Sequence, residues 1–167
     1  NLTNWDVSNV TNMASMFGFS TNFNGRISSW DVSNVTDMAS MFTFTTNFNQ
    51  NLTNWDVSNV TDMFNMFGQA SSFNRDIGNW DVSSVTNMKF IFNNTNAFNQ
   101  DLSSWDISNV TQMNDYTFFN TALSNANKCA IHETWSLNTN WPYSWGPNDG
   151  YDCDGNCVSE VIGYADF

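Results

Sequence analysis

Hydrophobic residues recur along this chain in columns 25 residues apart, without an insertion, as far as Met113. A fixed period of this kind predicts a stack of similar coils, because one coil cannot bury its own apolar side but neighbouring coils can bury it together. Each unit opens on Leu or Ile and continues through Trp, two Val or Ile positions, Met and two Phe positions. The Trp column is Trp5, Trp30, Trp55, Trp80 and Trp105, and the Met column is Met13, Met38, Met63, Met88 and Met113.

Two segments of the unit have different spacings. Trp5 and Val7 alternate with a polar residue, which predicts a short strand over residues 4–8, paired in parallel with its equivalents about 4.8 Å away. From Val10 to residue 17 the apolar offsets become three and four, which predicts a short helix or 3₁₀ turn over residues 11–17. The remainder of the unit is a return loop.

The predicted fold class is therefore a repeat solenoid, a leucine-rich-repeat-like coil with short parallel β-strands and short helices or 3₁₀ turns, closed by a helical C-terminal cap. We expect it to be right-handed, as crossovers between parallel strands usually are. A flat parallel β-helix is the structural alternative. The Val that stands at the usual Asn or Cys position of leucine-rich repeats puts the asparagine ladder of those proteins in doubt.

The period breaks after Met113, and the next tryptophan, Trp135, follows Trp105 by 30 residues. An exposed solenoid end needs a cap, and the segment up to Trp135 has the apolar spacing of a helix, with Ser124 or Asn125 as its N-cap. Asn1 is in phase with the repeats, so we expect residues before it, or another chain covering this end. The predicted units are residues 1–121 (five repeats), 122–145 (cap) and 146–167 (an acidic, Cys-containing tail or linker).

The composition of the chain argues against several classes of function. The net charge is −12, from 16 acidic and 4 scattered basic residues, which excludes nucleic-acid binding because displacing counterions needs clustered cations. No apolar run is long enough to span a membrane, so direct membrane insertion is not expected. His132 is the one histidine, and without a nucleophile near it in the sequence we expect a cap or surface residue and no enzyme.

Each tryptophan of the Trp column is followed by Asp, and equal charges on adjacent coils need compensation. One reading is an Asx-turn, in which each carboxylate accepts from a backbone N–H two or three residues on. The other is a row of cation or ligand sites on a concave face, together with Asn54 and Asn79. A repetitive polar lattice suits a repetitive partner such as a polysaccharide. The Asp row is Asp6, Asp31, Asp56, Asp81 and Asp106.

The alternative binding edge is the set of return loops, which vary between coils and include Phe19, Phe44 and Gln69. A Thr column also recurs, beginning at Thr11, but a single file beside a helix is a poor match to the flat Thr array that ice binding needs. Formal N-glycosylation sequons recur as well, and helix capping by their Asn and Thr is the alternative explanation. Sequon asparagines are Asn1, Asn9, Asn34, Asn51, Asn59 and Asn109.

The acidic tail carries the remaining candidate chemistry. Its pattern resembles a fragment of a calcium loop without the closing Glu, so Ca²⁺ is the one candidate cofactor and the tail is its candidate site. Cys153 and Cys157 are predicted to form a small disulfide, with Cys129 as the rival partner of either. The candidate metal ligands are Asp149, Asp152, Asp154 and Asn156.

Units such as Phe23-Asn-Gly-Arg-Ile-Ser-Ser-Trp-Asp-Val-Ser-Asn-Val-Thr-Asp-Met resemble the BspA-type leucine-rich-repeat surface proteins, from Asn1 to about Trp145. The resemblance implies a secreted or surface-attached protein that mediates adhesion, and it implies no catalytic residues. The expected function is a non-catalytic extracellular recognition module for a glycan or a surface protein. The alternative is a structural spacer or fibre subunit that stacks with copies of itself.

Overall fold

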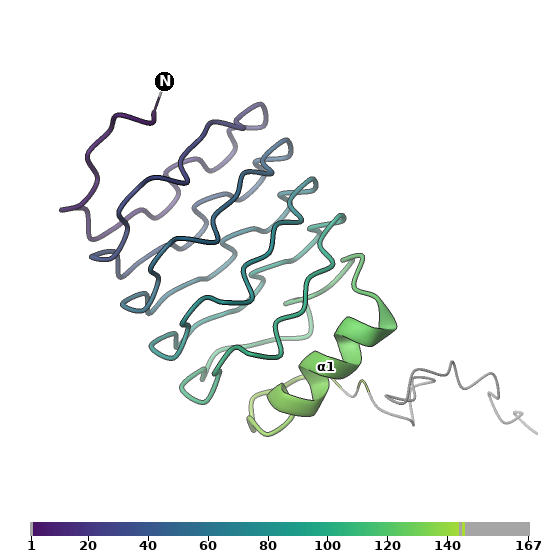
Figure 1. Cartoon of the computed structure of the whole chain (residues 1–167). Helices are drawn as coiled ribbons and strands as arrows, with labels where there is room; N and C mark the ends of the chain where they lie inside the picture. The colour runs from purple at the N-terminus through teal and green to yellow at the C-terminus, as the bar shows by residue number, and fades with distance from the viewer. Residues whose placement is uncertain (1, 144, 146–167) are drawn as a thin grey trace, which may run out of the picture.

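The computed structural model describes residues 2–143 and 145 and shows a stack of coils closed at one end by helix α1 (Asn125–Trp135) (Figure 1). Within the described residues the coils contain neither a β-sheet nor a helix, and their only strand-like elements are isolated parallel bridges. The prediction of a leucine-rich-repeat coil, with one strand and one short helix per unit, is therefore wrong, and a β-helix is not formed either. No described helix is long and apolar enough to cross a membrane.

Turns replace the strand predicted over residues 4–8. The Trp5 N–H donates to the Leu2 carbonyl (3.1 Å) and the Val10 N–H to the Val7 carbonyl (2.8 Å), so the chain reverses direction on both sides of Asp6. The physical cause is the Asp side chain, which accepts from the backbone two residues on and favours a turn over an extended strand. Trp5 and Val7 alternate with Asp6 in the short segment between these two turns, where no strand is formed.

The helix predicted over residues 11–17 is absent because residues Ser15 and Phe19 are left-handed, with φ of 59° and 62°. The N–H groups of Met16 and Gly18 close turns on carbonyls three residues back, at 3.2 and 3.0 Å. The intervening N–H groups, from Met13 to Phe19, donate instead to the next coil at 2.7–3.0 Å. Hydrogen bonds within the coil and between coils thus alternate along this segment. The apolar offsets of three and four place side chains in the core from successive turns instead of from one helix.

Inter-coil hydrogen bonds along this segment form what we call the ladder edge, comprising residues 11–19 and their equivalents in later coils. Thr36 adds to it, since both its N–H (2.8 Å) and its hydroxyl (3.2 Å) donate to the Thr11 carbonyl. The pattern repeats through the exposed Thr column. The parallel bridges of this edge join Asn12, Asp37, Asp62, Asn87 and Gln112 in succession.

Two rings at the ladder edge stack across coils more closely than the tryptophans do. Phe19 and Phe44 have ring centroids 4.9 Å apart there, whereas the rings of Trp5 and Trp30 are 6.3 Å apart and those of Trp80 and Trp105 are 6.2 Å apart. The Asp row follows the Trp column directly, and the described residues there form no β-sheet, so the expected concave sheet is absent.

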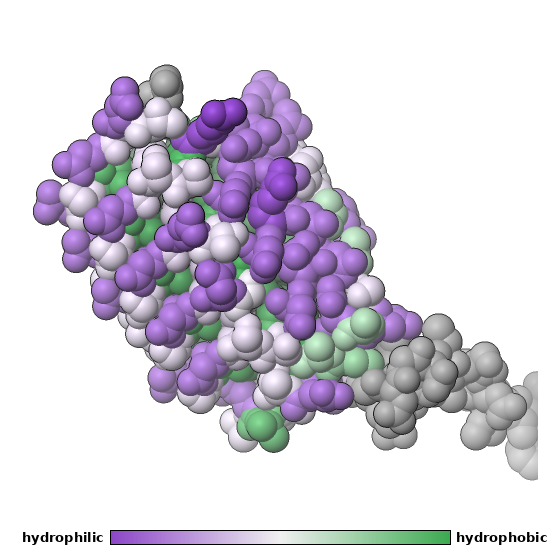
Figure 2. Space-filling model, in the orientation of Figure 1, coloured by the Kyte–Doolittle hydropathy of each residue, from purple (hydrophilic) through white to green (hydrophobic). Residues whose placement is uncertain are grey.

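The apolar columns form one continuous core. Trp30, Trp55, Trp80 and Trp105 are buried, as predicted, but Trp5 in the first coil is 54% exposed. Each buried indole N–H donates to the carbonyl that opens the preceding unit, at 3.0–3.1 Å. Figure 2 shows the result on one face, where hydrophilic side chains cover most of the surface and hydrophobic atoms show mainly in gaps between them.

An asparagine ladder is present, although not at the position occupied by Val10. Asn49 accepts the Asn74 N–H on its side-chain oxygen (3.1 Å), and Asn74 accepts the Asn99 N–H in the same way (2.8 Å). Asn99 continues the ladder by accepting the Ser124 N–H (2.8 Å), and Ser124 is the N-cap of α1. The ladder therefore fixes the start of the helix against the last coils.

The last coil and the cap each restore one column whose residue departs from the period of 25. Phe118, 26 residues after Phe92, stacks on it at 5.7 Å, so the extra residue is absorbed before the Phe position. Trp135 stacks on Trp105 at 6.0 Å and donates its indole N–H to the Leu102 carbonyl at 3.1 Å. The tryptophan of the last coil is thus covered by another tryptophan, like those of the inner coils.

Candidate functional site

The Asp row is exposed along its whole length, and every carboxylate is locked by the serine two residues on. Asp6 accepts from both the backbone N–H (3.1 Å) and the hydroxyl (2.6 Å) of Ser8 through Oδ1. Asp31, Asp56 and Asp81 repeat both bonds with similar lengths. The Asx-turn reading therefore describes the local structure. The bonds between each of these carboxylates and its serine use Oδ1, which leaves Oδ2 for a ligand's donor.

Hydrogen bonding lowers the pKa of four carboxyl groups in the row. The Ser8 hydroxyl and then its N–H hold the pKa of Asp6 below its ordinary value, and Ser33 and Ser83 act in the same way on Asp31 and Asp81. For Asp106 the backbone N–H of Ser108 is the largest cause of a lowered pKa, while the charge of Asp81 opposes it slightly. A row of fixed, ionised acceptors suits a ligand rich in hydroxyl or ammonium donors.

The two asparagines predicted beside the row differ in their surroundings. Asn54 is exposed, and Asn79 is exposed but donates its amide to the Thr53 carbonyl of the preceding coil at 3.0 Å. The sequon asparagines are engaged similarly, since Asn34, Asn59 and Asn109 donate Nδ2 to carbonyls of preceding coils at 2.7–2.8 Å. In the described residues these sequon amides join coils, and none of them caps a helix.

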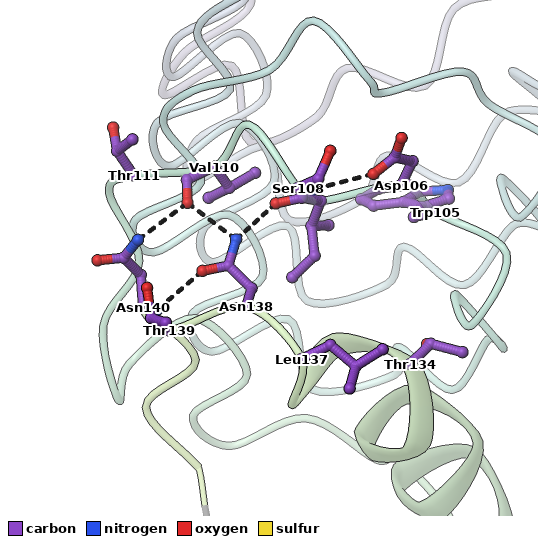
Figure 3. Close-up of a pocket in the computed structure, with 11 residues that line it drawn as sticks. Trp105, Asp106, Ser108, Val110, Thr111, Thr134, Leu137, Asn138, Thr139 and Asn140 are labelled. Atoms are coloured by element: carbon purple, nitrogen blue, oxygen red, sulfur yellow. Dashed lines mark hydrogen bonds between the residues drawn. The ribbon is translucent and has the colours of Figure 1, made fainter.

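The Asp row ends in a pocket of about 370 Å³ between the last coil and the loop that follows α1 (Figure 3). Asp106 and Ser108 approach it from the coil, and Leu137, Asn138 and Asn140 from the loop. Asn138 fastens the loop by donating to the carbonyls of Ile107 (2.6 Å) and Val110 (3.0 Å). The loop therefore closes one end of the row.

The chemistry of the pocket is that of a polar site with a partly apolar lining. Asp106 is the one charged residue among those that line it, and hydroxyls come from Ser108, Thr111, Thr134 and Thr139. Leu137, which is 85% exposed, supplies an apolar surface at the rim. A single ionised carboxylate with neutral donors and acceptors repels anions and fits a neutral polyol or an ammonium group.

Sequence reasoning did not find the loop side of this pocket. Leu137, Asn138 and Asn140 lie beyond the last repeat, where no column marks them as equivalent to anything upstream. The available signal is that the chain after Trp135 is rich in Asn and Thr, the residue types that bond free carbonyls at an open end. Only the packing of α1 on the last coil brings this segment to the Asp row.

The other candidate residues do not form a site together. His132 accepts the indole N–H of Trp141 on Nδ1 at 3.0 Å, which is a packing contact of the cap. Across residues 2–143 and 145, no group of three or more His, Cys, Asp or Glu side chains is placed to hold a metal ion. The predicted calcium ligands and the Cys153–Cys157 pair lie outside the described residues, and Cys129 is buried in α1. The tail ligands are Asp149, Asp152, Asp154 and Asn156.

Comparison with known proteins identifies a family. The chain belongs to the family described as "Mycoplasma protein of unknown function, DUF285", which matches it over residues 1–78 and again over residues 45–139. The two matches overlap and together extend from the first coil into the segment after α1. No curated protein matches the chain. No solved structure matches it either.

Proposed function

We propose that this member of the DUF285 family is a non-catalytic recognition module of a secreted or cell-surface protein, and that its Asp row binds a glycan. The observation that carries the proposal is the repetition of one exposed, ionised carboxylate with one locked geometry on every coil. A ligand that repeats can meet the same acceptor many times, so weak contacts add to useful avidity. The resemblance to BspA-type surface proteins supports the surface location and an adhesive role.

The pocket at the end of the row gives the ligand a direction. A linear glycan lying along the Asp row would meet the wall formed by Leu137, Asn138 and Asn140, so its terminal unit would sit beside Asp106. The row supplies acceptors for hydroxyl donors, and the rim of the pocket supplies an apolar surface at Leu137. Terminal-unit recognition would make binding depend on the chain end as well as on chain length.

A fibre or spacer built by stacking is the competing function. Stacking of copies through both ends requires two open ends, whereas α1 and Trp135 cover the last coil (Figure 1). A covered last coil blocks stacking of copies through this end, which favours the recognition module.

The test removes charge from the row while keeping the turns. A triple variant, Asp31→Asn, Asp56→Asn and Asp81→Asn, keeps a side-chain oxygen for each serine and should fold with a wild-type circular dichroism spectrum. On a glycan array it should lose most binding, because three ionised acceptors become amides. The matched control is Asp62→Asn, which changes one carboxylate on the ladder edge and should leave glycan binding intact.

Two results would contradict the proposal. One is a correctly folded triple variant that binds the array as well as the wild-type protein does. The other is loss of glycan binding when Phe19, Phe44 and Gln69 are replaced and the Asp row is untouched, which would move the glycan site to the loops.

A separate change, Leu137→Ser, should weaken binding of short glycans that end in the pocket more than binding of long ones.

A further inference from the structure

Three phenylalanines stand where the backbone disfavours them. The ladder edge has two left-handed positions in its coils, and six of the nine left-handed residues there are Ser, Asn or Gln. Phe19, Phe44 and Phe90 instead have φ of 62°, 56° and 62°. A bulky residue in this region is a conformational outlier, while Asn tolerates it well. The fold therefore does not require an aromatic residue at these positions, and it carries strain where one is present.

The rings do not compensate by entering the core. Phe19 is 70% exposed, and Phe44 and Phe90 are partly exposed. Phe19 stacks on Phe44 at 4.9 Å. Phe90 contacts Phe64 edge-on and Tyr116 in a stacked arrangement, both at 5.8 Å.

Tyr116 then contacts Phe119 at 5.6 Å, and these two rings are 47% and 50% exposed. Strained, surface-exposed aromatic residues that gather on one edge indicate a binding surface. We call this set the aromatic edge: Phe19, Phe44, Phe64, Phe90, Tyr116 and Phe119.

Charge decides which partner fits the aromatic edge. Asp37 and Asp62 lie on the same ladder segments, where each accepts the N–H two residues on, and Asp115 is adjacent to Tyr116. Lys89 is the one cation among the described residues of this edge. With a net charge of −12 on the whole chain, a second copy would be repelled. Aromatic faces beside carboxylates attract guanidinium groups, through cation–π contact and ion pairing together.

We propose that the aromatic edge is a docking surface for an arginine-bearing segment of another protein. The site is separate from the Asp row, and the proposal does not depend on glycan binding there. Arginine side chains would lie over the exposed ring faces, and the flanking carboxylates would pair with their charge. Aromatic residues are also those that most often dominate protein interfaces.

The probe is an oligoarginine peptide, compared with an oligolysine peptide of equal length by titration calorimetry at physiological salt. The wild-type chain should bind oligoarginine more tightly, since Arg stacks on rings better than Lys does. Phe19→Asn and Phe90→Asn should each weaken oligoarginine binding about fivefold, the factor that corresponds to ~1 kcal/mol of cation–π contact. Binding of oligolysine should change less, because the protein's charge is unaltered.

The same variants separate binding from folding. Because Asn is favoured at a left-handed position, Phe19→Asn and Phe90→Asn should melt at the wild-type temperature or above it. Gln69→Asn is the matched control: it has φ of 60° in the same column as Phe19 and carries no ring, so it should leave both peptides' binding unchanged. If the rings only stabilised the fold, the Phe→Asn variants would instead melt below the wild type and keep their peptide binding.

Three outcomes would overturn the inference. Wild-type protein that binds oligoarginine no better than oligolysine has no guanidinium site on this edge. Phe→Asn variants that melt well below wild type and keep full oligoarginine binding would make the rings structural. If a soluble neutral polysaccharide binds instead, and the Phe→Asn changes abolish that binding, the aromatic edge is a carbohydrate site.

Discussion

Trp135 stacks on Trp105 in the same way as Trp105 stacks on Trp80. The two pairs stack at 6.0 and 6.2 Å, and Trp135 and Trp105 each donate the indole N–H to the carbonyl that opens the preceding unit. The cap therefore supplies the contact that a sixth repeat would supply, although its tryptophan is five residues late in the sequence. Closing a stack in this way removes apolar surface from water at the one coil that has no successor.

Replacement of Trp135 with Ala should destabilise the protein by about 3–5 kcal/mol, the usual cost of removing a buried aromatic side chain. Trp80→Ala, the same change in the interior of the column, should cost a similar amount, and urea denaturation followed by circular dichroism compares the two. Hydrogen exchange should distinguish them, since loss of the cap should expose amides of the last coils first. A Trp135→Ala variant that unfolds like the wild type would show that the cap does not close the stack.

The left-handed residue at position 40 tests the turn structure of the ladder edge. Ser40 has φ of 57°, and its N–H donates to the Phe64 carbonyl of the next coil at 2.7 Å. Ser40→Val should cost about 1–3 kcal/mol because a β-branched residue is strained there. Ser40→Asn should be neutral, since Asn65 occupies the equivalent position. Equal melting temperatures for the two variants would be inconsistent with a left-handed backbone.

Thr95 is a buried hydroxyl whose removal should be measurable. It is fully buried and donates to the Phe67 carbonyl at 2.7 Å, as Thr45 donates to Phe17 at 2.8 Å. Thr95→Val keeps the shape and removes the donor, so the free energy of unfolding should fall by about 1 kcal/mol. Thr95→Ser keeps the donor and serves as the control for the missing bond. If Thr95→Val lowers the free energy of unfolding less than Thr95→Ser does, the hydroxyl contributes nothing net to stability.

Asp81 should titrate below ordinary aspartates, and its hydrogen bonds to Ser83 are the main cause. Ser83→Ala removes the side-chain hydrogen bond, the largest influence on this carboxyl, so the pKa of Asp81 should rise toward its usual value. NMR titration of the Asp81 side-chain carbon measures this directly. Asp31, bonded to Ser33, should be unaffected in the same spectra and provides the internal control.

The sign of the linked pH effect follows from the lowered pKa. Because folding lowers the pKa of Asp81, its hydrogen bonds stabilise the fold above the pKa of an unfolded aspartate, about 3.9. That contribution is lost as the pH falls from there through the lowered folded value. Wild type should therefore lose more stability than Ser83→Ala over this acid range. The opposite order would mean that Asp81 is not held by Ser83.

Some of the candidate site could be predicted from the sequence. The Asp row is visible as a column, and the Asx-turn that holds it was one of two readings of the Asp-Val-Ser pattern. The pocket beside Asp106 could not be found this way, because Asn138 reaches it only through the path of the chain after α1. Phe90 and Tyr116 were missed for a related reason: the sequence does not show that they meet across coils.

The repeat pattern alone shows which residues share a column, since a strict period of 25 allows each side chain one set of neighbours in a stack. Burial of Trp30 and Met38 follows from that period, because apolar columns must be covered by the next coil. Backbone conformation does not follow from it. Apolar offsets of three and four fit a helix and a run of turns equally well, and the left-handed φ of Ser15 decides between them. Only the tertiary structure supplies that choice, since the N–H groups a helix would use internally are bonded to the neighbouring coil.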